Sequence, residues 1–147
     1  MNDVGFRLRD RLRQERDALI DRFERGGRVD TLLKGLARSV DRLLRELAHS
    51  TGLARRVAII AVGGYGRGEL FPHSDVDILI LLPADATAED RLRIEPLIGL
   101  LWDLGLELGH SVRTVDECGV EAARDVTVLT SMLESRLIAG PRPLYES

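Results

Sequence analysis

The chain has 147 residues, of which 44% are hydrophobic and 31% charged, the size and composition of one ordinary globular domain. A single cysteine, Cys118, excludes an intrachain disulfide and fits a reducing compartment. No apolar run approaches the roughly 20 residues that span a bilayer, and the start of the chain does not have the pattern of a signal peptide. We therefore expect a cytoplasmic protein with no membrane partner.

The net charge of −3 is divided unevenly along the chain. Residues 1–56 carry 14 Lys and Arg against 9 Asp and Glu, whereas residues 57–147 carry 7 against 15. In the basic part the two signs alternate, as they do on solvated helix faces that carry local ion pairs. We therefore expect no nucleic-acid binding by this part.

The first two elements are predicted helices. Residues 4–25 place leucines on one helical face, and a second helix with Asp30 as its N-cap should stop before Gly52. We expect residues 1–56 to form an N-terminal helical segment that packs on the core, residues 57–147, within a single domain.

The core alternates between apolar runs typical of buried strands and the periodicity of helices. The predicted strands are 57–62, 75–82 and 106–115, and the predicted helices are 87–104, 116–124 and 126–138. Strands separated by helices indicate an α/β or α+β domain with a small mixed sheet covered by helices. Trp102, on an apolar face of the predicted helix 87–104, is expected in the core. For Tyr65, which lies in a glycine-rich loop, two roles stay open: stacking on a base and packing of the loop.

Asp75 and Asp77 stand two residues apart on a predicted strand. Their side chains should project from the same face, roughly 7 Å apart along the backbone at about 3.3 Å per residue. Two like charges on one face repel unless a cation lies between them, and ligands that are all oxygen favour Mg²⁺ or Mn²⁺ over Zn²⁺. On their own such pairs are common, and a solvated strand end is the alternative.

A glycine-rich stretch precedes these acids. Gly63 and Gly64 directly follow a buried strand, twelve and eleven residues before Asp75, and glycines there let backbone N–H groups approach an anion. The stretch has no lysine for a P-loop, and its spacing places Glu69 where a dinucleotide-binding loop requires the last glycine. A phosphate-binding loop followed by paired carboxylates suits chemistry on a nucleoside triphosphate.

The run from Gly63 to Asp77 resembles the motif of the DNA polymerase β-like nucleotidyltransferase superfamily. More narrowly, residues 62–82, 101–114 and 125–140 resemble the bacterial protein-PII uridylyltransferases. The resemblance implies a polymerase β-like fold and a transfer of UMP from UTP to a tyrosine hydroxyl of the nitrogen regulatory protein PII. It further implies release of pyrophosphate by in-line attack at two Mg²⁺ ions.

Site residues follow from the resemblance position by position. Asp75 and Asp77 would hold the metals, Gly63 and Gly64 the triphosphate, with Ser74 nearby. Arg67 would neutralise phosphate or be an ordinary surface arginine.

The superfamily also implies a third acid on a later strand, for which the predicted strand 106–115 offers Glu107. Because the facing of that strand cannot be fixed from sequence, Arg113 is left open as a residue that faces the triphosphate instead.

Longer members of the resembled family carry a His-Asp phosphohydrolase domain and ligand-sensing ACT domains. Each of the three histidines here is followed by serine, so no His-Asp pair exists. We expect a fragment or a truncated relative without de-uridylylation or glutamine sensing. Two alternatives stay open, an adenylyltransferase of the same superfamily and an inert nucleotide-binding or regulatory module.

Overall fold

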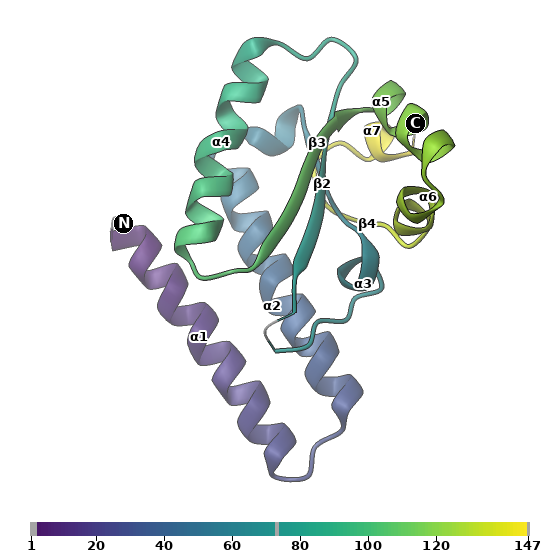
Figure 1. The fold of residues 1–147 in the computed structure, drawn as a ribbon. Coiled ribbons are helices and arrows are strands. Elements are labelled where there is room, and N and C mark those ends of the chain that lie inside the picture. The colour runs from purple at the N-terminus through teal and green to yellow at the C-terminus, as the bar shows by residue number, and fades with distance from the viewer. Residues whose placement is uncertain (1–2, 73, 147) are drawn as a thin grey trace.

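A computed structural model describes residues 3–72 and 74–146, and its centre is one mixed sheet (Figure 1). The four strands lie in the order β3-β2-β1-β4. Their bounds are β1 Ala58–Ala61, β2 Val76–Leu82, β3 Leu108–Thr114 and β4 Arg136–Ala139. β1 is antiparallel to both β2 and β4, whereas β2 and β3 are parallel. This is the small mixed sheet that the sequence predicts.

One face of the sheet is covered by the longer helices (Figure 1). These are α1 Asp3–Glu24, α2 Val29–Ser50 and α4 Ala88–Asp103, together with the 3-10 turn η1 Leu53–Arg55. Alternate residues of β1 and β2, such as Ile59, Ile78 and Ile80, pack against them in the larger apolar core. α1 and α2 therefore form the predicted N-terminal helical pair, and both contribute to the larger core, α2 with more buried residues than α1.

The other face is covered more thinly. A smaller cluster forms around Ala58, Ile60, Leu79 and Leu81, and α5 Val115–Arg124 and α7 Arg142–Tyr145 contribute the side chains that pack on it. α6 Val126–Leu133 follows α5 on this side, and the short helix α3 Gly63–Gly66 lies at the end of β1 (Figure 1). Asp77 shares this face, because side chains two apart on a strand point the same way.

The fourth strand is absent from the sequence prediction, which continued a helix from 126 to 138. The structure ends α6 at Leu133 and pairs β4 with β1, with Ala139 opposite Ile59. A strand of four residues has too short a pattern to be distinguished from a helix end, and its partner is far away in sequence.

Two smaller expectations are also wrong. Trp102 is 52% exposed, because the core face of α4 falls on the neighbouring Leu101, which is fully buried. Asp30 lies in the first turn of α2, whose N-cap is Arg28 without a side-chain hydrogen bond. Within the described ranges, no helix is both long and apolar enough to cross a membrane.

Candidate active site

The side chain of Asp77 lies between two glycines at the start of β2. Asp77 pairs in register with Gly109 on β3, and a Cβ atom at position 109 would overlap Asp77 Oδ1. On the other side, a Cβ atom at Gly63 would be 3.6 Å from Oδ2. Position 109 therefore has to be glycine for the Asp77 carboxylate to occupy this position.

Asp75 is exposed and lies just before β2. The strand begins at Val76, one residue after the predicted start. Burial, and secondly the negative charge of Asp75, raises the pKa of Asp77 above its ordinary value. A partly desolvated carboxylate beside a second carboxylate is a pair that a cation would stabilise. The two acids offer only oxygen ligands, so the donor set fits Mg²⁺ or Mn²⁺.

The glycines of the predicted phosphate loop form the helical turn α3 themselves. Val62 is extended at the N-cap, and Gly63 follows with a φ of 61°, in the left-handed region that favours glycine. Gly63 and Gly64 occupy the first turn, where backbone N–H groups have no intrahelical acceptor. The N–H of Val62 donates to the backbone oxygen of Asp77 at 3.0 Å, so this turn is joined directly to the acid strand.

Arg67 lies beside this turn. A Cβ atom at Gly64 would be 3.4 Å from Arg67 Nη2, so the guanidinium lies next to that glycine. Arg67 Nη1 also donates to Glu134 Oε2 at 2.5 Å, and its side chain is 53% exposed. Arg67 is thus partly exposed, as an ordinary surface arginine would be, and it also lies next to the glycine turn, where it could neutralise phosphate.

A cavity of about 310 Å³ opens beside Asp77, a volume within the usual range of ligand sites. We call it the Asp77 cavity; it is lined from β2, β3, α3 and α6. The polar side chains that line it are Asp77, His110, Ser111, Arg113, Asp125 and Thr127. Arg113, left open as an alternative from sequence, lines this cavity and forms an ion pair with Glu121 at 3.4 Å.

Four of these polar residues were not predicted as site residues: His110, Ser111, Asp125 and Thr127. Asp125 caps α6, since its Oδ1 accepts from the N–H of Thr127 at 2.8 Å. Ser111 lies two residues after Gly109, the strand partner of Asp77, so both are on the same face of β3. The sequence alone does not give this register, and therefore did not indicate Ser111.

Glu107 and Ser74 lie at a different cavity of about 280 Å³, bounded by α1, α2 and the turn before β3. Glu107 was expected inside the third strand, but β3 begins at Leu108 and Glu107 is exposed before it. Among the described residues, no three or more acidic, histidine or cysteine side chains are grouped to hold a metal. The backbone oxygen of Glu107 nevertheless accepts from the N–H of Val76 at 2.8 Å, so Glu107 lies alongside the residue between the two aspartates.

Ser74 is engaged locally, since its hydroxyl donates to the backbone oxygen of Phe71 at 2.9 Å. Its place immediately before Asp75 keeps it near the acid pair in the chain, although it does not line the Asp77 cavity.

The fold and the acid pair define a nucleotidyltransferase domain. Residues 40–125 match the family described as "Nucleotidyltransferase domain", and the chain belongs to this family. The expected fold class, a polymerase β-like mixed sheet covered by helices, is confirmed.

Closer relatives carry a more specific name. The chain is 50% identical over 141 residues to the "Bifunctional uridylyltransferase/uridylyl-removing enzyme" of Cupriavidus metallidurans, covering 96% of this chain and 16% of the relative. The protein of the same name in Ralstonia nicotianae is 53% identical, over 95% of this chain and 16% of the relative. That of Burkholderia thailandensis is 55% identical, over 87% of this chain and 15% of the relative. The chain thus spans about one sixth of the length of these relatives, and the resemblance to uridylyltransferases is confirmed.

Proposed function

We propose that this chain transfers UMP from UTP to a tyrosine hydroxyl of a PII-type nitrogen regulatory protein and releases pyrophosphate. The observation that carries the proposal is the Asp77 carboxylate, held between Gly63 and Gly109 with Asp75 before it. The specific nucleotide and acceptor are supported by the resemblance of residues 62–82, 101–114 and 125–140 to uridylyltransferases. The name of the relatives supports the same nucleotide.

Each part of the site has a role in this proposal. Asp75 and Asp77 would hold Mg²⁺, which when bound would neutralise charge on the phosphates. The backbone N–H groups of Gly63 and Gly64, in the first turn of α3, would donate to phosphate oxygens, and Arg67 would add a positive charge beside them.

In the transfer step the tyrosine oxygen of the acceptor bonds to the α-phosphorus of the nucleotide. The bond from that phosphorus to the bridging oxygen breaks, and its electrons leave with pyrophosphate. The hydroxyl proton needs a basic group, and Glu107 is the residue that the sequence proposes for it.

The test is incubation of the chain with Mg²⁺, each α-labelled nucleoside triphosphate in turn, and PII protein. We expect label from UTP on PII, and its loss in Asp75→Asn and Asp77→Asn. Asp103→Asn, which removes an exposed carboxylate at the end of α4, is the matched control and should label normally.

Other outcomes separate the alternatives. A preference for ATP would replace the uridylyl assignment by adenylyl transfer and leave the family unchanged. Full labelling by the Asp75→Asn and Asp77→Asn variants would reject the metal assignment. Failure to bind any Mg²⁺–nucleotide would favour an inert regulatory module.

A further inference from the structure

A buried ionic cluster joins three elements behind the candidate site. Asp41, on α2, is only 5% exposed. Its Oδ1 accepts a hydrogen bond from the Tyr65 hydroxyl at 2.5 Å, and its Oδ2 accepts one from Arg136 Nη1 at 2.6 Å. Tyr65 belongs to α3 and Arg136 to β4. The cluster therefore connects the N-terminal helical pair, the glycine turn and the edge strand.

Tyr65 is fixed at three points within this cluster. Besides its hydroxyl bond to Asp41, its backbone oxygen accepts from Arg136 Nη2 at 3.0 Å. The Arg136 guanidinium also lies over its ring, 5.3 Å from the centroid, within the range of a cation–π contact. Burial, and secondly the charge of Asp41, raises the pKa of the phenol well above its ordinary value, so Tyr65 stays a protonated donor.

The same contacts fix the turn that carries Gly63 and Gly64. Tyr65 is the third residue of α3, and it is 1% exposed. The next residue, Gly66, lies so close to the end of α6 that a Cβ atom there would overlap the backbone oxygen of Glu134, the C-cap of that helix. A displacement of Tyr65 would therefore also move the backbone N–H groups of Gly63 and Gly64, the two residues before it.

Net stability is a poor explanation for this cluster. The desolvation of a buried ion pair offsets most of its Coulomb attraction, so such pairs often add little to the free energy of folding. Arg136 Nε, moreover, is buried without a hydrogen-bond partner among the described residues. The hydrogen bonds at the hydroxyl and at the backbone carbonyl of Tyr65 are directional, so together they define the orientation of this residue.

We propose that Asp41 is a positioning residue for nucleotide binding: with Arg136 it holds Tyr65, and through Tyr65 it holds the glycine turn in the conformation that binds the triphosphate. This inference rests on the proposed function. It also settles the two roles open for Tyr65 in favour of packing. It further requires Arg136, which lies beyond the 40–125 range matched by the family.

The test compares nucleotide affinity with stability in Tyr65→Phe and Asp41→Asn. Calorimetry without acceptor gives the Kd of Mg²⁺–UTP, and thermal unfolding in the same buffer gives the melting temperature. We expect the Kd to rise about tenfold in each variant, since coupling energies between contacting residues commonly reach that size. In turnover, the KM for UTP should rise while the KM for the protein acceptor stays unchanged.

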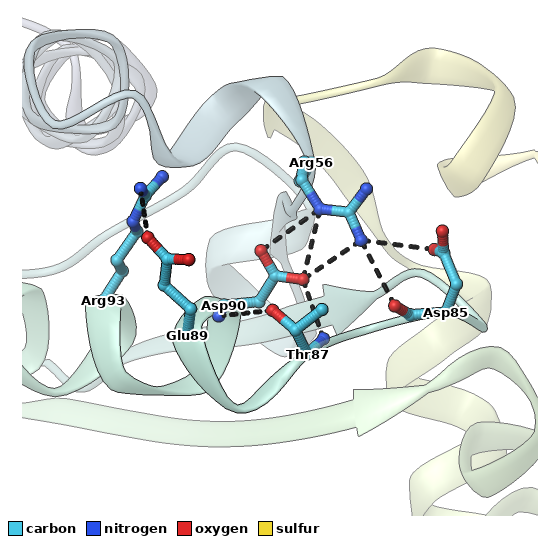
Figure 2. Close-up of polar contacts among 6 residues, drawn as sticks. All are labelled: Arg56, Asp85, Thr87, Glu89, Asp90 and Arg93. Atoms are coloured by element: carbon cyan, nitrogen blue, oxygen red, sulfur yellow. Dashed lines mark hydrogen bonds and ion pairs between the residues drawn. The ribbon is translucent and has the colours of Figure 1, made fainter.

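The chain offers a matched control on another helix that covers the same face of the sheet. Asp90, on α4, is buried like Asp41, with side chains 8% and 7% exposed, and it pairs with Arg56 at 3.1 Å (Figure 2). Its carboxylate also accepts from the N–H of Thr87 as part of the α4 cap. Asp90→Asn should lower the melting temperature and leave the Kd of Mg²⁺–UTP unchanged.

Three results would overturn the inference or its basis. Wild-type affinity in Tyr65→Phe and Asp41→Asn would reject the positioning role while leaving the proposed function intact. An equal loss of affinity in Asp90→Asn would show that any destabilisation weakens binding, which also rejects it. No binding of Mg²⁺–UTP by the wild-type chain would reject the proposed function itself. If Asp41→Asn does not fold, Tyr65→Phe decides, because it removes a single oxygen atom.

Discussion

Asp77→Asn should make the metal-free protein more stable while removing its response to Mg²⁺. The raised pKa of Asp77 means that folding favours the protonated carboxyl. Its contribution is therefore fully present below the unfolded pKa of about 3.9 and is lost as pH rises through the folded pKa. At pH 7 the ionised Asp77 is a cost, and asparagine avoids it without changing the shape of the side chain.

Burial is the larger cause of the raised pKa of Asp77, and the spacing of the two acids gives the size of the part that comes from the charge of Asp75. Residues two apart on a strand are separated by about 6.6 Å, so unit charges there repel by about 0.6 kcal/mol in water and about 2.5 kcal/mol at an effective dielectric constant of 20. Asp75 is exposed, which favours the lower part of that range, about 1 kcal/mol. For a chain of this length that corresponds to a rise in melting temperature of about 2–4 °C.

Thermal unfolding followed by circular dichroism, in EDTA and then in Mg²⁺, measures both halves of the prediction. The wild type should gain stability with Mg²⁺ and the variant should not, and the advantage of the variant in EDTA should shrink as the pH is lowered toward 4. A variant that melts below the wild type in EDTA at pH 7 would refute the repulsion argument. Equal stabilisation of both proteins by Mg²⁺ would refute the metal assignment.

Three further substitutions test the site and its surroundings. Gly109→Ala should displace the Asp77 carboxylate and reduce transfer about 100-fold with the fold retained, as read by activity and circular dichroism. Glu107→Gln should abolish transfer at an unchanged melting temperature, because Glu107 is the residue proposed to take the hydroxyl proton; full transfer by this variant would remove Glu107 from the site. Asp90→Asn should lower the melting temperature at pH 7. The pair with Arg56 holds the pKa of Asp90 below its ordinary value, so this deficit should narrow in acid, where the wild type also loses the ionised form.

The sequence predicts the local part of this structure well. The two N-terminal helices, three strands and the glycine turn are each encoded by a contiguous pattern of apolar residues and glycines. The acid pair and the turn lie within fifteen residues of each other, so their spacing in the chain was enough to bring them together. β4 was missed because a strand of four residues is defined by its pairing with β1, not by its own pattern.

The site was harder to predict wherever two strands had to be aligned. Opposite Asp77 the parallel neighbour β3 presents Gly109, and a shift of one residue would present a different face. Local pattern could not supply that register, so Glu107 was chosen as the acid in an apolar slot. Arg113, which the sequence left open as the alternative, lines the Asp77 cavity.

Support for the site comes from outside the segment that carries its motif. The turn next to Asp77 is held by contacts of Tyr65 with Asp41 and Arg136. Asp41 and Arg136 are 95 positions apart and belong to α2 and β4. β4 also protects β1, which would otherwise be the open edge of the sheet. The smallest unit expected to bind nucleotide is therefore larger than the motif, and extends from α2 through β4.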